Sequence, residues 1–214
     1  MTAAGVSSRP MLRITGRSPE SAGPLLRVVA AFTRRALGRL AGRAPEGMLA
    51  PLHAYALLPR VLLAYGMLEG ATAGLRRLPE RLRMLAELKA ATATTCEYCI
   101  DLGSQVARRA GVRDEELLAL ARYRESGLFT DLEKLVLDYA VGMSRTPVEV
   151  PDTLFAELRA HLDETQIVEL THVIALENLR GRFNLALGIG SAGFSEGMVC
   201  ALPDVAPGSM PPGA

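Results

Sequence analysis

Apolar residues recur every three or four positions along most of this 214-residue chain, a spacing typical of α-helices that bury one face. No stretch alternates between apolar and polar residues for long, and the β-branched residues are scattered, so no segment has the pattern of a β-strand. Proline and glycine divide the chain into segments, as they do where helices begin and end. The sequence therefore predicts an all-α fold.

Capping patterns set the limits of the predicted helices. Pro24 and Gly42 suit the two ends of a first, arginine-rich helix, and Thr130 and Asp163 each begin a capping box. Pro59 interrupts the ladder of helical hydrogen bonds, so we expect two helices there instead of one. The predicted helices span residues 24–42, 49–57, 60–73, 79–94, 97–110, 114–124, 130–143, 151–161 and 164–188.

The two ends of the chain differ in composition from the middle. Residues 1–23 mix Ser, Gly, Pro and Arg without periodicity, which predicts a flexible arm. Residues 204–214 end a Gly- and Pro-rich tail, which we expect to be disordered. Between them, residues 24–203 are long enough to form a single domain with a sizeable core.

The composition limits which binding partners and which cellular location we expect. The net charge of +1 at pH 7 gives no electrostatic reason to expect nucleic acid binding. Although 49% of the residues are hydrophobic, no run of about 18 apolar residues is free of charge, so we expect no membrane span. The N-terminus lacks the apolar core and cleavage site of a secretory signal. The 3 cysteines are too few for a disulfide framework, and we therefore expect a reducing, cytoplasmic location.

Two of the cysteines, Cys96 and Cys99, form a C-x-x-C pair at the predicted start of a helix. Backbone amides at a helix N-terminus stabilise negative charge, so this position favours the thiolate, which is the reactive form of cysteine. One sulfur could attack a peroxide, and the other could convert the resulting sulfenic acid to a disulfide. The carboxylate of Glu97 opposes this activation unless it points to solvent.

Two other interpretations of the cysteine pair stay open. Two cysteines buried in a helical core would have the same spacing without any chemistry. A zinc site would need two further ligands, and the candidates that remain show no paired spacing. These candidates are Cys200, His53, His161 and His172. The sequence thus favours redox chemistry and predicts neither a metal nor a cofactor.

The stretch ELKAATATTCEYCIDLGSQVARRAG resembles the core of the carboxymuconolactone decarboxylase and alkylhydroperoxidase D-like (AhpD-like) superfamily. A later stretch, ELTHVIALENLRGRFNLALGI followed by GFSEGMVCALP, is similar to the C-terminal part of these proteins. The resemblance covers about residues 50–203. It implies a bundle of about eight helices, homo-oligomers that are commonly trimers or hexamers, and thiol-dependent peroxidase activity in C-x-x-C members.

The peroxidase motif of this superfamily is a Glu, a C-x-x-C pair twelve positions later, and a His four positions after the second cysteine. Carried over residue by residue, Cys99 resembles the cysteine that attacks the peroxide, and Cys96 resembles the one that resolves it. Met84 occupies the Glu position and Gly103 the His position. The two motif residues that move protons are therefore missing.

Three other residues are candidates for proton transfer. Glu87 lies about one helical turn from the motif's Glu position and nearer to the cysteines, so it could accept the thiol proton directly or through water. The alternative for Glu87 is an ion pair with Lys89 or Arg83 at the surface. His172 and Asp101 are candidates for a proton relay, His172 only if tertiary packing brings it to the cysteines.

Polar residues interrupt the last predicted helix, within the second stretch that resembles the family. They are Glu177, Asn178, Arg182 and Asn184. Buried polar contacts would explain them, and we expect these contacts to be structural.

Three functions follow as hypotheses. The leading one is reduction of hydroperoxides by Cys99 and Cys96, with an unidentified thiol reductant and with Glu87 as proton acceptor. The second is decarboxylation of a carboxylated lactone, a reaction that needs no cysteine pair. The third is a non-catalytic helical oligomer or binding protein whose motif has decayed.

Overall fold

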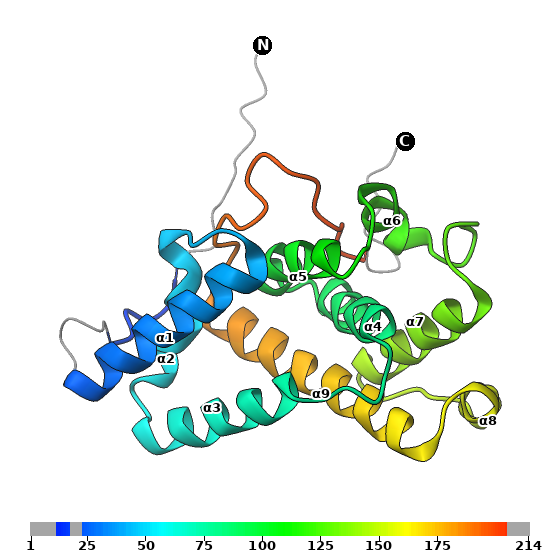
Figure 1. Ribbon diagram of the computed structural model, residues 1–214, viewed down its shortest axis with the longest axis horizontal. Helices are drawn as coiled ribbons and strands as arrows, with labels where there is room; N and C mark the ends of the chain where they lie inside the picture. Colours follow the sequence, from blue (N-terminus) through cyan, green and yellow to red (C-terminus); the bar gives the residue numbers. More distant parts are fainter. Residues whose placement is uncertain (1–11, 18–22, 205–214) are drawn as a thin grey trace, which may run out of the picture.

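The computed structural model describes residues 12–17 and 23–204 and is helical throughout, with no β-strand in these ranges (Figure 1). The helices are α1 Pro24–Ala41, η1 Glu46–Leu49, α2 Ala50–Tyr55, α3 Pro59–Ala73, α4 Glu80–Ala93, α5 Glu97–Arg109, α6 Asp114–Ala119, η2 Leu120–Arg122, α7 Asp131–Ser144, α8 Asp152–His161 and α9 Glu164–Leu187. The all-α prediction is confirmed. In this part of the chain, no helix is long and apolar enough to cross a membrane.

The predicted capping patterns place most helix ends within one or two residues. Thr130 and Asp163 both form complete capping boxes, and Gly42 ends α1 in the left-handed conformation with φ 78°. The helix predicted for residues 114–124 is too long, because the α-helix ends at Ala119 and continues as the short 3₁₀ helix η2. The carbonyl of Leu120 accepts a hydrogen bond from Lys89 of α4 at 3.2 Å.

Helix α4 is the centre of the bundle. It packs against α5, α7 and α9, and Figure 1 shows it nearly end-on between α5 and α7, with α9 passing below. Leu85 and Leu88 on one side of α4 join a core with α5 and the N-terminal helices. Ala86 and Ala90 on another side join a second core with α7, α8 and α9. Because α4 leads directly into the cysteines, its two buried faces fix their position.

Both ends of the described chain are held against the domain. The backbone amides of Arg13 and Arg17 donate to carbonyls at the end of α9 and in α2, at 2.9 Å each. Asp204 forms an ion pair of 2.8 Å with Lys89, whose side chain is buried. The other residues of the predicted arm and tail lie outside the described residues; they are 1–11, 18–22 and 205–214.

Helix α9 crosses the junction between α4 and α5 at Gly181. A Cβ atom at this position would lie 2.8 Å from Thr94 Oγ1 and 3.5 Å from Cys96 Cβ. Thr94 has a stiff, β-branched side chain, and its hydroxyl donates to the carbonyl of Ala90 at 2.9 Å. The close approach of α9 to the cysteines therefore depends on the missing side chain.

We expect Gly181→Ala to lower the free energy of unfolding by roughly 1–3 kcal/mol, the usual cost of overpacking a core. Gly70→Ala is the matched control, because Gly70 lies inside α3 and a Cβ atom there would have no neighbour within 4 Å. That change should instead raise stability by up to about 1 kcal/mol, since alanine favours the helix. Urea unfolding of both variants measures the difference, and equal effects would contradict a tight contact at Gly181.

Candidate active site

A disulfide joins Cys96 and Cys99 across the first turn of α5. Cys96 is the N-cap residue of this helix, and its sulfur accepts a hydrogen bond from the backbone N–H of Cys99 at 3.3 Å. Cys96 is completely buried, whereas 7% of Cys99 is exposed. Cys99 is thus the residue of the pair that lies nearer to solvent.

The turn that leads into the pair is strained. Thr95 has a φ of 57°, in the left-handed region that β-branched residues avoid. This residue lies between the end of α4 and the N-cap of α5, and it directs the chain so that the sulfur of Cys96 accepts a hydrogen bond from the first turn of the new helix. The next residue but one, Glu97, is exposed. Its carboxylate therefore faces solvent, the arrangement in which it opposes thiol activation least.

Asn184 of α9 contacts both sulfurs. Its side-chain Nδ2 donates to Cys96 Sγ at 3.7 Å and to Cys99 Sγ at 3.6 Å. The residue is buried, and its Oδ1 atom has no hydrogen-bond partner within the described chain. The sequence alone predicts structural contacts for Asn184 and gives no link to the cysteines. Asn184 lies three residues after Gly181 and therefore on the same face of α9. Only knowledge that this face packs against the cysteines would have linked Asn184 to the sulfurs.

Arg180, also on α9, binds carboxylates from three helices. It forms two hydrogen bonds with Glu69 of α3, at 2.9 and 2.6 Å, and one of 2.8 Å with Glu177 of α9. Glu87 of α4 lies 4.0 Å from the same guanidinium group. We call these four residues the Arg180 cluster. Neither Arg180 nor Glu69 stands out in the sequence.

Burial raises the pKa of Glu87 to about 7, although the charge of Arg180 opposes this shift. Burial likewise raises the pKa of Glu177. For Glu69, burial acts in the same direction, but hydrogen bonds from Arg180 outweigh it and hold the pKa below its usual value. One positive charge therefore faces three carboxyl groups, and the pKa is raised in two of them, Glu87 and Glu177.

Glu87 has Arg180 as its ion-pair neighbour and forms no hydrogen bond with either sulfur within the described residues. The alternative partner Lys89 is not available, because it is buried against Asp204. Arg83 donates to a backbone carbonyl of the loop before α4. Glu87 therefore belongs to the Arg180 cluster, with its side chain 24% exposed.

The two candidates for a proton relay have other partners. Nε2 of His172 lies 2.8 Å from the hydroxyl of Thr72 in α3. The Asp101 carboxylate accepts hydrogen bonds from the segment that follows α9; its donors are the hydroxyl of Ser191 and the backbone amides of Ala192, Gly193, Phe194 and Ser195. These contacts hold the 191–195 segment against α5. No hydrogen bond joins either residue to a sulfur in the described chain.

Gly103, at the position of the missing motif histidine, lies close to α4. A Cβ atom at Gly103 would lie 3.2 Å from Cδ1 of Leu88, a buried residue of α4. A larger side chain there requires Leu88 to move. Met84, at the motif's Glu position, is also buried. Both positions have thus become part of the contact between α4 and α5.

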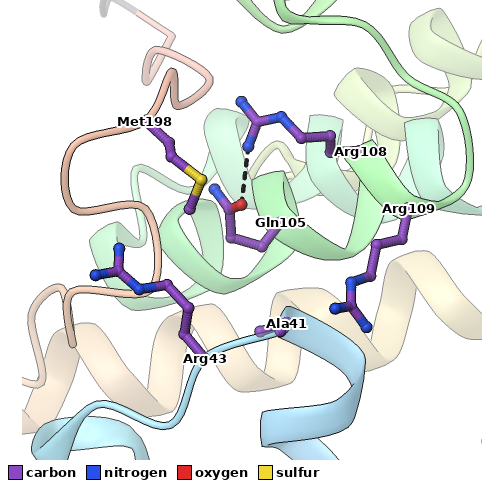
Figure 2. Close-up of a pocket in the computed structure, with 7 residues that line it drawn as sticks. Ala41, Arg43, Gln105, Arg108, Arg109 and Met198 are labelled. Carbon is purple, nitrogen blue, oxygen red and sulfur yellow. Dashed lines mark hydrogen bonds between the residues drawn. The ribbon is translucent and has the colours of Figure 1, made fainter.

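A cavity of about 320 Å³ lies between α5, the end of α1 and the segment after α9 (Figure 2). Nine residues separate Arg108 in its wall from Cys99, which corresponds to about 180° around a helix. Figure 2 also labels Arg43 and Arg109 in the wall, and all three arginines donate to backbone carbonyls.

Within the described ranges, no group of three or more His, Cys, Asp or Glu residues is placed to hold a metal ion.

The structure is thus an all-helical protein with a disulfide-bonded C-x-x-C pair at the start of α5. A model of the carboxymuconolactone decarboxylase family matches residues 58–141. The uncharacterized protein YnjA of Escherichia coli K12 is 37% identical over 159 residues, which are 73% of this chain and 84% of YnjA. The chain belongs to the carboxymuconolactone decarboxylase family.

Solved structures show the same fold at lower identity. A variant of the debrominase Bmp8 in complex with 2,3,4-tribromopyrrole has a TM-score of 0.69 at 22% identity, over 83% of this chain and 91% of that one. The AhpD core of an uncharacterized peroxidase-related protein from Ralstonia eutropha JMP134 has a TM-score of 0.68 at 18% identity, over 85% and 93%. The AhpD-like fold implied by the sequence resemblance is confirmed.

The raised pKa of Glu87 predicts a pH-dependent cost to stability. The folded protein holds this proton up to about pH 7, whereas the unfolded chain releases it near pH 4.5. Stability therefore falls as the pH rises through this window. Relative to Glu87→Gln, the wild type should lose about 1–3 kcal/mol of unfolding free energy between pH 4.5 and 8.

Urea unfolding of both proteins across this pH range measures the difference. Glu97→Gln serves as the control, because Glu97 is exposed and the difference from wild type should then stay constant. A constant difference for Glu87→Gln as well would show that Glu87 has an ordinary pKa.

Proposed function

We propose that this protein reduces hydroperoxides, with Cys99 as the attacking thiolate and Cys96 as the resolving cysteine. The observation that carries the proposal is the disulfide between these residues at the start of α5, since this bond is the oxidised product of the reaction. Membership of the carboxymuconolactone decarboxylase family supports it, as does a fold shared with a peroxidase-related protein.

The proposed reaction has three steps. The Cys99 thiolate attacks the terminal oxygen of the hydroperoxide, the O–O bond breaks, and an alcohol leaves after it takes up a proton. The Cys96 thiolate then attacks the sulfur of the Cys99 sulfenic acid, which forms the disulfide and releases hydroxide, protonated to water. A dithiol reductant finally converts the disulfide to two thiols and is itself oxidised to a disulfide.

The positions of the sulfurs support this division of roles. Cys99 is nearer to solvent, so both the hydroperoxide and the reductant reach its sulfur more easily than that of buried Cys96. When a reductant attacks Cys99, Cys96 leaves as a thiolate. The backbone N–H of Cys99 already donates to the Cys96 sulfur and stabilises the charge that develops there.

Glu87 is the proposed proton acceptor. A pKa of about 7 suits a group that must take up and release protons at neutral pH. Transfer between the thiol and Glu87 would be direct or through water. The mechanism assigns no step to His172 or Asp101, because their hydrogen bonds connect them to α3 and to the segment after α9.

The other partners are part of the same proposal. The reductant is an unidentified thiol compound or protein, which requires a reducing compartment such as the cytoplasm. Large apolar side chains lie exposed along α3 and support assembly into a homo-oligomer; they are Val61, Leu63, Met67 and Leu68.

Replacement of each cysteine tests the proposal. With an organic hydroperoxide such as cumene hydroperoxide and dithiothreitol as reductant, Cys99→Ser should reduce turnover to the uncatalysed level, since the nucleophile is lost. Cys96→Ser should still form a sulfenic acid on Cys99, which dimedone traps for detection by mass spectrometry. Cys200→Ser is the control, because Cys200 is a free cysteine that contacts Ser104 and not the pair. Its turnover should equal that of the wild type.

Full activity in Cys99→Ser would disprove the assignment of the nucleophile. If the wild type neither consumes hydroperoxide nor forms the disulfide when oxidant is added, the proposed peroxidase function is wrong. A non-catalytic helical protein would then be the better interpretation.

Glu87→Gln tests the proton acceptor separately. We expect turnover at pH 7 to fall roughly 100-fold, as is typical when a general base is lost, and the limb of the rate–pH profile near pH 7 to disappear. The exposed Glu97, next to Cys96 in sequence, provides the control variant Glu97→Gln with an unchanged profile. An unchanged profile in Glu87→Gln would remove Glu87 from the mechanism.

A further inference from the structure

The side chain of Asn184 has only weak acceptors in the oxidised protein. Its Nδ2 atom donates to two disulfide sulfurs, and its Oδ1 atom is buried without a partner in the part of the chain that the structure describes. Sulfur in a neutral group accepts hydrogen bonds weakly. As a purely structural residue, a buried asparagine with these contacts would stabilise the fold poorly.

Asn178 shows what a structural asparagine on the same helix looks like. It is also buried, and its Oδ1 atom is also unpartnered among the described residues, but its Nδ2 donates to Ser144 Oγ at 3.1 Å and to the carbonyl of Ile174 at 2.9 Å. Both of these acceptors are oxygen atoms. The difference between the two residues is therefore in the acceptor, which for Asn184 becomes strong only when a sulfur carries a charge.

The orientation of the Asn184 amide follows from the chemistry of the pair. A disulfide offers only acceptors, so Nδ2 and not Oδ1 must face the sulfurs. An amide nitrogen carries two hydrogens, which matches one donor to each of two sulfurs. Hydrogen bonds to a charged acceptor are about twice as strong as those to a neutral one.

We propose that Asn184 is the residue that stabilises the thiolate form of the reduced Cys96–Cys99 pair, through one N–H donated to each sulfur. Cys96 then has two donors, since the backbone N–H of Cys99 also contacts its sulfur. Cys99 has the Asn184 amide as its side-chain donor. This inference deepens the proposed function, which begins with a thiolate, but it concerns the thiols alone and is measured without a hydroperoxide.

None of the charged groups near the pair donates a hydrogen bond to either sulfur in the described chain. On α5, Glu97 is exposed and Asp101 is bound to the 191–195 segment. On α4 the group that titrates near neutral pH is Glu87, and on α9 the Arg180 guanidinium is already bound to carboxylates of the Arg180 cluster. The donors to the two sulfurs within the described chain are amides, which stay uncharged across the working pH range.

The test is the pKa of each cysteine in the reduced full-length protein. Alkylation by iodoacetamide is followed from pH 5 to 10, and each cysteine is read separately by peptide mass spectrometry. In Asn184→Leu we expect the pKa of Cys99 to rise by about one unit, the size of one lost hydrogen bond to a charged group. Alkylation of Cys99 at pH 7 should then be about tenfold slower, because the thiolate fraction falls.

Two further variants keep the result interpretable. Asn184→Ala removes the same two donors without adding a charge, so it should raise the pKa of Cys99 by a similar amount and decides the question if the leucine variant does not fold. Asn178→Leu is the matched control, a buried asparagine of α9 without a sulfur contact. Its alkylation profile should match that of the wild type.

A profile of Asn184→Leu or Asn184→Ala that superimposes on the wild type would overturn the inference. So would an equal shift in Asn178→Leu, because the effect would then be a general loosening of α9. A wild type without peroxidase turnover, together with a raised pKa in the Asn184 variants, would disprove the proposed function and leave the role of Asn184 intact.

Discussion

The contact of α9 with the junction between α4 and α5 positions both parts of the candidate site. At its centre is Gly181, which lets the backbone of α9 approach Thr94 and Cys96. One turn further along α9, Asn184 meets the two sulfurs. On the other side of Gly181, Arg180 gathers three carboxyl groups beside α4. A single close helix crossing thus determines which polar groups reach the cysteines and which reach Glu87.

The candidate site has two parts: the two sulfurs with their N–H donors, and Glu87 with the other residues of the Arg180 cluster. Amide groups serve the sulfurs: the N-terminal turn of α5 and the side chain of Asn184 supply N–H donors but cannot carry protons. The group that titrates near neutral pH, Glu87, is held in the Arg180 cluster. In the superfamily motif a histidine stands one turn after the second cysteine, and here that position is Gly103, which lies close to Leu88 of α4. The N–H donors to the sulfurs and the carboxyl group with a pKa of about 7 therefore belong to different residues.

Local sequence signals are enough to predict the helices and the cysteine pair, because periodicity, caps and breakers act within a few residues. Thr130 and Asp163 begin helices as expected, and Cys96 lies at a helix N-terminus. The contact of Asn184 with the sulfurs could not be predicted, since 85 residues separate it from Cys99 and only tertiary packing joins them. The partner of Glu87 escapes prediction for the same reason: Arg180 comes from another helix, while the nearby Lys89 is buried against another part of the chain.

The N-cap of α5 determines how reduction of the disulfide would affect the end of this helix. The atom that accepts from the backbone amide of Cys99, in the first turn of this helix, is the sulfur of Cys96 rather than an oxygen. Sulfur remains a hydrogen-bond acceptor as a disulfide, as a thiol and as a thiolate, so the end of the helix keeps its partner in every oxidation state. Reduction of the disulfide would therefore leave the cap of α5 in place. The atom that caps the helix is also an atom of the disulfide, so a change in its oxidation state does not require the helix end to rearrange.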